Sequence, residues 1–343
     1  MVNPISSDNP PFYRQRWAIY TIKVFNIQLL KFNYIVFYYM RAVLFPGQGS
    51  QYVGMGCDFY EKYDFVKKIF DKVDNTLGFS LSDFILNGPE EKLKLTQNTQ
   101  PAIMTVGVSI FEVLKKHFNI TLKDTIFFAG HSLGEYTALV CSGSLTLEKA
   151  AYLLNERGKA MQDAVPPDQG AMLAVLGVNL EEVEKEIILL PKNELCEIAN
   201  DNCIGQVVVS GTKIAIQTLK ENLKQKKKKG IILPVSAPFH CSLMEKASSS
   251  MKNKIEKTAF LKPNPSVISN VTAKIETDIN MIKSLLVKQI TSRVRWRESV
   301  DYMIKEGVTD FIEIGPGKVL SGLVKKINKN VKISNINSLN DLK

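Results

Sequence analysis

The sequence predicts an α/β fold in which a large subdomain, built on a parallel sheet, carries an inserted ferredoxin-like small subdomain. Two observations lead to this prediction. Short apolar runs that indicate buried strands alternate with segments of helical spacing over most of the chain, which is typical of α/β proteins. Between about 166 and 236 the order changes to strand, helix, strand, strand, helix, strand, which is the ferredoxin-like order. We therefore expect a large subdomain over 41–165 and 237–343 and a small one over 166–236.

Residues 1–40 differ in composition from the rest and are interpreted as a targeting leader. They are rich in Tyr, Phe and Ile and carry several basic residues against a single acid, Asp8, as targeting segments do. The apolar stretch over 17–40 is broken by lysines and amides, so it lacks the uninterrupted run of about 18 apolar residues that a spanning helix needs. We expect no stable membrane anchor. An N-terminal helix or a misassigned start of the gene is the alternative.

The remaining elements follow from apolar runs bounded by turn residues and from helical spacing. Before the insertion we expect strand 42–45, helices 59–77 and 100–118, strand 125–129, and helices around 137–141 and 146–164. In the insertion we expect strand 171–178, helix 180–190, strands 195–199 and 206–210, helix 213–228 and strand 231–236. After it we expect strand 266–269, helices 280–291 and 297–306, and strand 311–314.

The overall composition restricts the kind of site that the protein can hold. Its 343 residues are 45% hydrophobic and 23% charged, as in ordinary globular proteins. The five cysteines include no CxxC pair and the chain has three histidines, so neither a disulfide framework nor a metal site is indicated. The net charge of +10 would suit nucleic acid, an anionic membrane, CoA phosphates or an acidic protein. A lysine-rich genome explains it equally well.

A nucleophile is predicted at Ser132, where Gly130-His131-Ser132-Leu133-Gly134 lies between a buried strand and a helix. This is the strand–turn–helix context of the nucleophile elbow, and it makes the large subdomain α/β-hydrolase-like. The glycines are needed because the turn is too tight for Cβ atoms on both sides. The N–H groups and the dipole of the following helix favour an oxyanion beside the serine.

A serine nucleophile needs a base, and the histidines are the candidates. His131 is adjacent to Ser132, but consecutive residues at a sharp turn point in different directions. His117 follows two lysines near a helix end, where a solvated side chain is the usual case. His240 follows an apolar strand, in a loop that can present a base. Elimination therefore favours His240, with a purely structural histidine as the alternative.

Several motifs together carry a family resemblance. The chain resembles the malonyl-CoA:acyl-carrier-protein transacylases from about 42 to 340, and the related acyltransferase domains of megasynthases are the nearest similar group. The motifs are, in order, Phe45-Pro46-Gly47-Gln48-Gly49-Ser50-Gln51, Gly130-His131-Ser132-Leu133-Gly134-Glu135-Tyr136, Arg157-Gly158-Lys159-Ala160-Met161-Gln162, Gly205-Gln206-Val207-Val208-Val209-Ser210-Gly211, Pro238-Phe239-His240 and Glu313-Ile314-Gly315-Pro316-Gly317-Lys318-Val319-Leu320.

The resemblance implies the catalytic roles. Ser132 corresponds to the acylated nucleophile and His240 to the base that returns a proton to the leaving thiolate. No carboxylate completes a triad in this family; a backbone carbonyl orients the imidazole, and the corresponding residue is Gln289. The backbone N–H groups of Gln48 and Leu133 correspond to the oxyanion hole. Ser50, Glu135 and Tyr136 belong to the motifs but are interpreted as structural.

The resemblance also implies how substrates are recognised. Arg157 corresponds to the residue that binds the malonyl carboxylate, a task for which its planar guanidinium is suited. Phe239 corresponds to a position where Phe goes with malonyl and a smaller residue with methylmalonyl. The loop with Asn200 and Asn202 departs from the family pattern at Cys203-Ile204, where Ser-Pro is expected, which puts roles for the two asparagines in doubt.

We expect the acidic carrier protein to dock on basic residues near the mouth of the site. The proposed residues are Lys318, Lys325 and Lys326, with an extension over Arg293, Arg295 and Arg297. The lysine run over 226–229 is the comparison surface, because such runs are usually solvated faces.

The sequence thus predicts a malonyl-CoA:acyl-carrier-protein transacylase of type II fatty-acid synthesis that works by a ping-pong mechanism through malonyl-Ser132. We expect a monomer without cofactor or nucleic acid. A separate enzyme with a leader suggests the stroma of a plastid, with the mitochondrion as alternative. The rival functions are a serine thioesterase or esterase that passes the acyl group to water, and a non-catalytic carrier-binding module.

Overall fold

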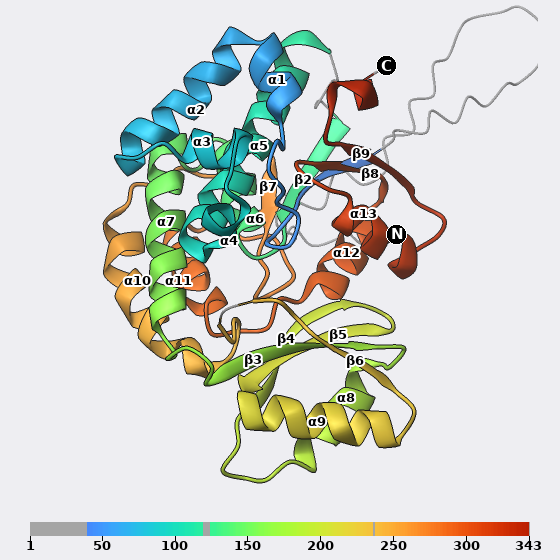
Figure 1. Cartoon of the computed structure of the whole chain (residues 1–343). Coiled ribbons are helices and arrows are strands. Elements are labelled where there is room, and N and C mark those ends of the chain that lie inside the picture. The colour runs from blue at the N-terminus through green and yellow to red at the C-terminus, as the bar shows by residue number, and fades with distance from the viewer. Residues whose placement is uncertain (1–39, 119–123, 236, 343) are drawn as a thin grey trace, which may run out of the picture. The chain divides into compact units, whose positions relative to one another are not determined.

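The computed structural model describes residues 40–118, 124–235 and 237–342 (Figure 1). Except for Met40, the predicted leader lies outside the described residues. The described residues belong to one compact unit that contains two sheets. No helix in these ranges is long and apolar enough to span a membrane.

The larger sheet has five strands in the order β7-β2-β1-β8-β9, and every pair in it is parallel. Its strands are β1 (Met40–Phe45), β2 (Thr125–Gly130), β7 (Ser266–Ile268), β8 (Val308–Ile314) and β9 (Lys332–Ile336). Side chains of a strand alternate between its two faces, and β1 fills a separate core on each. Val43 and Phe45 belong to one apolar cluster, whereas Ala42 and Leu44 belong to another. Both faces are therefore covered, as parallel sheets require.

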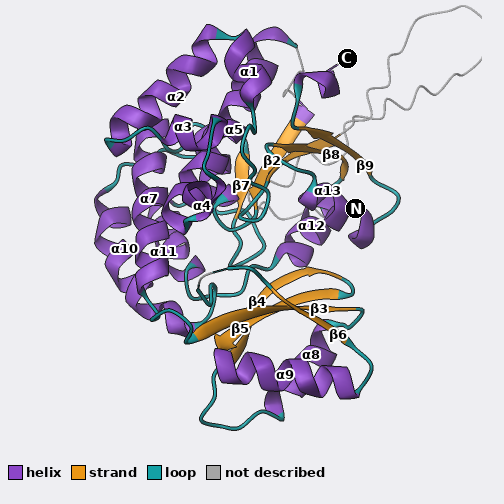
Figure 2. Cartoon of the chain, viewed as in Figure 1, coloured by secondary structure: helices purple, strands orange, loops and turns teal. Residues whose placement is uncertain are grey.

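Helices cover the two faces of this sheet (Figure 2). On one side α12 and α13 pack with Leu44 around the fully buried Trp296. On the other side lie α5 and α6, with α7 packed on α5. The helices of the large subdomain are α1 (Cys57–Lys62), α2 (Asp64–Leu77), α3 (Leu81–Leu86), α4 (Glu90–Lys94), α5 (Thr96–His117), α6 (Gly134–Cys141), α7 (Leu147–Asp163), α10 (Glu245–Lys257), α11 (Ile279–Gln289), α12 (Trp296–Lys305) and α13 (Val319–Ile327), with short 3₁₀ turns at Ser242–Met244 and Leu339–Leu342.

The smaller sheet is antiparallel, in the order β4-β5-β3-β6. Its elements run β3 (Gly170–Leu176), α8 (Leu180–Ile188), β4 (Cys196–Cys203), β5 (Gln206–Thr212), α9 (Lys213–Gln225) and β6 (Lys229–Ile232). Leu173 and Val175 pack with residues of α8 and α9, while Met172 and Ala174 belong to the main core of the large subdomain. The predicted fold class, an α/β protein with a parallel sheet and a ferredoxin-like insertion, is confirmed.

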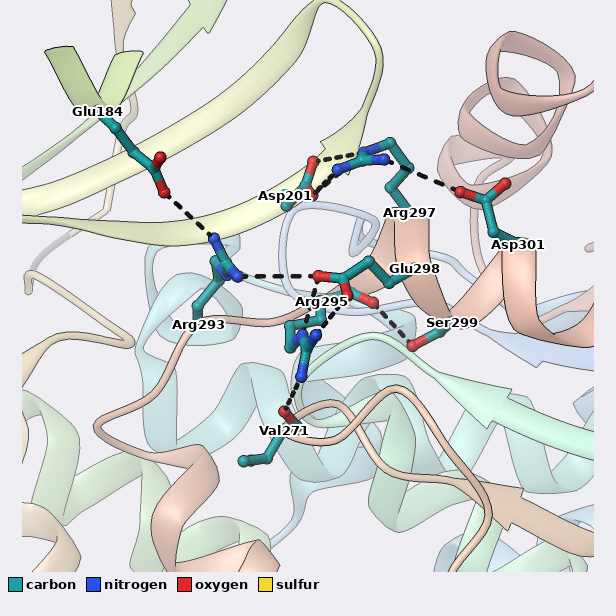
Figure 3. A network of polar contacts seen from close by, with 9 residues as sticks. All are labelled: Glu184, Asp201, Val271, Arg293, Arg295, Arg297, Glu298, Ser299 and Asp301. Carbon is teal, nitrogen blue, oxygen red and sulfur yellow. Dashed lines mark hydrogen bonds and ion pairs between the residues drawn. The ribbon is translucent and has the colours of Figure 1, made fainter. Parts of the chain in front are cut away.

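Ion pairs join the small subdomain to α12 and to the segment before that helix (Figure 3). The carboxylate of Asp201 on β4 is buried and accepts from Arg297 on α12, with 2.8 Å between Oδ2 and Nη2. The backbone N–H of Asp201 donates to the carbonyl of Val294 at 3.0 Å. Arg293 lies 3.8 Å from the carboxylate of Glu184 on α8. Since Asp201 stands between Asn200 and Asn202, this junction also fixes the end of β4 that contacts His131.

The structure differs from the sequence prediction in several elements. The helix predicted over 59–77 is two helices, because Tyr63 is extended. The strand predicted over 231–236 is β6, which ends at Ile232. Helix α10 was not predicted, since its buried residues are spaced four apart among serines and lysines. Strand β9 was missed because it is a sheet edge without a continuous apolar run. The helices α3, α4 and α13 were missed as well.

Candidate active site

Ser132 occupies a sharp turn between β2 and α6, with a positive φ of 54°. A Cβ atom on Gly130 would lie 1.9 Å from the backbone of Gly134, and one on Gly134 would lie 2.3 Å from the carbonyl oxygen of Phe45. The N–H of His131 donates to that same carbonyl at 3.1 Å. Glycine is thus required on both sides of the serine, and the turn is packed against the end of β1.

His240 is the base. Its Nε2 lies 2.8 Å from Ser132 Oγ, and its Nδ1 lies 2.8 Å from the backbone oxygen of Gln289. A carbonyl can only accept, so Nδ1 carries the proton and Nε2 is free to take one from the serine. Burial, and then the positive charge of Arg157, lower the pKa of His240 to about 3. The imidazole is therefore neutral at physiological pH, which a general base requires.

Arg157 lies on α7 with only 1% of its surface exposed. Nη2 donates to Ser132 Oγ at 3.1 Å and to Gln289 Oε1 at 2.9 Å, and Nη1 donates to Gln100 Oε1 at 2.7 Å. Burial lowers the pKa of the guanidinium. All three acceptors are neutral, and a buried cation without a carboxylate partner is costly. The guanidinium beside the nucleophile is thus suited to receive an anion.

The side-chain amide of Asn270, which comes just after β7, holds the turn that carries Ser132. Its Oδ1 accepts from the N–H of Ser132 at 2.7 Å, and its Nδ2 donates to the carbonyl of Gly130 at 2.7 Å. This residue was not predicted from the sequence. A signal was available, because Asn270 comes just after β7, which pairs with β2, and the carboxyl ends of neighbouring parallel strands meet at one edge of a sheet.

The backbone N–H groups of Gln48 and Leu133 lie in the two segments that meet at the turn. A Cβ on Gly47 would lie 2.6 Å from the carbonyl oxygen of His131, so the loop after β1 touches the turn. Leu133 directly precedes α6. In the described part of the chain neither N–H donates to a protein acceptor. Both are suited to stabilise the negative charge that forms on a carbonyl oxygen when Ser132 attacks the carbonyl carbon.

The remaining residues predicted at the site lie around this centre. Phe239 is buried in the main core, directly before His240. Asn200 and Asn202 contact His131 instead of the nucleophile: Oδ1 of Asn202 lies 2.9 Å from Nε2, and Nδ2 of Asn200 lies 3.5 Å from it. No group of three His, Cys, Asp or Glu residues among those described is placed to hold a metal ion.

The proposed docking lysines lie on or beside α13, and all three are exposed. Lys318 directly precedes the helix, and Lys325 and Lys326 are in its last turn. A Cβ on Gly317 would lie 3.5 Å from the side chain of Ser50. The start of α13 is therefore next to the loop that carries Gln48.

The arginines named as an extension of this surface are engaged in ion pairs. Arg295 and Arg293 pair with Glu298, and Arg297 pairs with Asp201, as Figure 3 shows. Their charge is compensated within the chain, so the extension is left out of the docking surface. In the comparison run two lysines are likewise paired, Lys226 with Glu186 and Lys228 with Glu182.

The chain is similar to known proteins over most of its length. Residues 43–340 match the family described as acyl transferase domain. A malonyl CoA-acyl carrier protein transacylase of Bacillus subtilis is 44% identical over 85% of this chain and 91% of the relative. The crystal structure of an acyl-carrier-protein-S-malonyltransferase from Bartonella henselae has a TM-score of 0.86 and 42% identity, over 88% of this chain and 97% of that one. A malonyl-transacylase solved in complex with a type II PKS acyl-carrier protein has a TM-score of 0.85 and 36% identity, over 88% and 97%.

The buried carboxyl group of Glu135 gives the site a pH-dependent contribution to stability. Burial raises the pKa of Glu135 from 4.5 to about 7, against the opposing effect of its hydrogen bonds. The folded protein therefore binds more protons than the unfolded chain between these values. The stabilisation from protonation is complete below about pH 4.5 and is lost as the pH rises through about 7.

We predict that Glu135→Gln removes this contribution. The free energy of unfolding of the wild type, minus that of the variant, should fall by at most about 3 kcal/mol from acidic to mildly alkaline pH. Urea titrations of both proteins at several pH values measure the difference. The depressed pKa of His240 acts in the opposite direction, but it is present in both proteins and cancels. A difference that stays constant with pH would contradict the assignment.

Proposed function

We propose, for a chain that belongs to the acyl transferase domain family, that it transfers malonyl groups from CoA to the phosphopantetheine thiol of acyl carrier protein in type II fatty-acid synthesis. The observation that most directly supports this function is the buried guanidinium of Arg157. It lies 3.1 Å from the nucleophilic oxygen of Ser132 and has no carboxylate partner among the described residues. An acyl chain that ends in a carboxylate satisfies this cation while its thioester carbon meets the serine. A neutral acyl chain leaves the cation unpaired.

In the first half-reaction Ser132 Oγ attacks the thioester carbon of malonyl-CoA while its proton moves to His240 Nε2. The N–H groups of Gln48 and Leu133 stabilise the resulting oxyanion. When the C–S bond breaks, His240 returns the proton to the CoA thiolate and is neutral again. In the second half-reaction the carrier thiol gives its proton to His240 and attacks the malonyl ester, and the proton then goes to Ser132. No cofactor is needed for either step.

The charges of Arg157 and His240 are coupled in a way that favours a malonyl substrate. The positive charge of Arg157 is one of the causes of the low pKa of His240. A malonyl carboxylate on the guanidinium offsets that charge, so it raises the pKa of His240 towards the value of an effective base. A neutral acyl group does not provide this offset. The same residue therefore selects the substrate and prepares the base.

The two rival functions receive less support. A thioesterase of the usual triad type has a carboxylate on its histidine, whereas Nδ1 of His240 bonds to the backbone oxygen of Gln289. The buried Arg157 also favours an anionic acyl chain over a neutral ester. A non-catalytic module would have no need for the 2.8 Å contact between Ser132 and His240.

The function is tested by isolating the two half-reactions. Incubation with malonyl-CoA should add one malonyl group to the intact protein, and Ser132→Ala should abolish the addition. Holo-acyl carrier protein should then remove the group as malonyl-carrier faster than water releases free malonate. Release mainly as free malonate would favour the thioesterase, and no mass increase in the wild type would contradict both enzymes.

Acyl selectivity should depend on Arg157. We expect Arg157→Ala to lower malonyl transfer by roughly 10²–10³-fold, the order expected for breaking a buried charge pair, while acetyl transfer holds or rises. Rates with malonyl-CoA and acetyl-CoA measure both effects. Phe239→Ser is the companion variant and should admit methylmalonyl-CoA without this loss, because it removes bulk and no charge. Survival of malonyl transfer in Arg157→Ala would rule out the carboxylate-binding role.

Carrier recognition is proposed at the exposed lysines of α13. Support comes from the start of α13, which lies next to the loop that carries Gln48, and from the acidic character of carrier proteins. Reversal of Lys325 and Lys326 to Glu should slow transfer from malonyl-enzyme to carrier but leave acylation by malonyl-CoA unchanged. The matched control reverses Lys227 and Lys229, exposed lysines of the comparison run. Equal loss in both half-reactions, or equal loss in the control, would disprove this surface.

The oligomeric state and the localisation are proposed as well. The protein is proposed to act as a monomer, because Ser132, His240 and Arg157 meet within one chain. It is proposed to work in an organelle, a plastid before a mitochondrion, because residues 1–40 have the composition of a leader and the family match begins at residue 43.

A further inference from the structure

We propose that Glu135 is a positioning residue, which sets the orientation of the Gln289 side chain and through it the places of Arg157 and His240. The inference rests on the proposed function and extends it to a residue of the Gly-His-Ser-Leu-Gly-Glu motif that sequence analysis interpreted as structural. Glu135 lies in the first turn of α6 and is 4% exposed. Its carboxyl group contacts neither Ser132 Oγ nor the imidazole.

Gln289 connects the residues of the site through both its backbone and its side chain. The backbone oxygen accepts from His240 Nδ1 at 2.8 Å. The side-chain Oε1 accepts from Arg157 Nη2 at 2.9 Å, and Nε2 donates to the backbone oxygen of Ser132 at 3.1 Å. Gln289 is fully buried. A change in the orientation of its amide therefore affects the nucleophile turn, the base and the cation together.

Glu135 determines which end of that amide faces Arg157. Nε2 of Gln289 donates to Glu135 Oε2 at 2.8 Å, and the N–H of Asn270 donates to the same oxygen at 3.0 Å. If the amide were reversed, its oxygen would face the carboxyl oxygen of Glu135, and its NH₂ would face the guanidinium of Arg157. Both contacts would be unfavourable in a buried site. The acceptor on Glu135 thus keeps Oε1 of Gln289 towards Arg157.

To orient the amide of Gln289, Glu135 must offer an acceptor oxygen within hydrogen-bond distance of Gln289 Nε2. A negative charge on the carboxyl group is not required. Its pKa of about 7 means that it is partly protonated at neutral pH, and the carbonyl oxygen of a protonated carboxyl group still accepts. The groups that face it are Arg157, Tyr136, Gln289 and Asn270. A small cavity bordered by Glu135, Ser269 and Glu276 adjoins the carboxyl group on another side.

The expected effect is on selectivity, because this chain of contacts ends on the residue that binds the malonyl carboxylate. Loss of the acceptor on Glu135 lets Arg157 leave its place. Malonyl transfer depends on that guanidinium, whereas acetyl transfer does not. A residue that only stabilised the fold would change both transfers by the same factor.

The test measures malonyl-serine and acetyl-serine formation in three variants. Glu135→Gln keeps an acceptor oxygen at the same length. Glu135→Met keeps the length of the side chain without an acceptor. Glu135→Asp keeps the carboxyl group but, being one methylene shorter, places it farther from Gln289. The ratio of malonyl to acetyl transfer should stay near the wild-type value in the Gln variant and fall on the order of 10-fold in the Met and Asp variants, as for a lost buried hydrogen bond. If the Met variant does not fold, the comparison of Gln with Asp decides.

Glu313 provides the matched control. It is fully buried, burial raises its pKa, and it accepts from Leu320 and Ser321 at the start of α13. Glu313→Met should lower the melting temperature without changing the ratio. An Asp variant of Glu135 that is more selective than the Gln variant, or a ratio unchanged in Met and Asp, would overturn the inference. Absence of malonyl-serine in the wild type would instead refute the proposed function.

Discussion

The positive φ of Ser132 is the constraint on which the rest of the site depends. A non-glycine residue in this region costs about 1–3 kcal/mol, so surrounding contacts must hold it. Two glycines leave room for the turn, the amide of Asn270 bonds to the N–H of Ser132 and to the carbonyl of Gly130, and the carbonyl of Phe45 accepts from His131. These contacts join the carboxyl ends of β1, β2 and β7. Ser132 is thus held in place by a backbone that the parallel sheet fixes.

Electrostatics then decide what chemistry Ser132 supports. Arg157 and His240 are both buried and both lie within hydrogen-bond distance of Ser132 Oγ. Burial, and then the positive charge of Arg157, lower the pKa of His240 and keep the imidazole neutral. Gln289 separates the cation from Glu135, the nearest carboxyl group in its hydrogen-bonded network. A carboxylate bonded directly to Arg157 would occupy the guanidinium and compete with the substrate. An amide between them supports the cation and leaves it able to bind an anion.

Features that depend on local sequence pattern could be predicted from the sequence. The strand, turn and helix around Ser132 follow from an apolar run and two glycines, and His240 and Arg157 from motifs. Asn270 and the partners of Glu135 depend on which strands are neighbours in the sheet, and that information is not local. Helix α10 was missed because Ala247, Met251 and Ile255 are separated by polar residues. The ion pairs of Arg297 and its neighbours were missed because their acids include residues of the inserted subdomain.

The central claim is that one guanidinium both receives the substrate carboxylate and adjoins the nucleophile. A crystal structure of the protein after reaction with malonyl-CoA tests it most directly. The account predicts an ester on Ser132 Oγ, with the malonyl carboxylate bonded to the guanidinium of Arg157 and the ester carbonyl oxygen directed at the N–H groups of Gln48 and Leu133. An ester on Ser132 whose carboxylate points to solvent, or to any other cation, would contradict it.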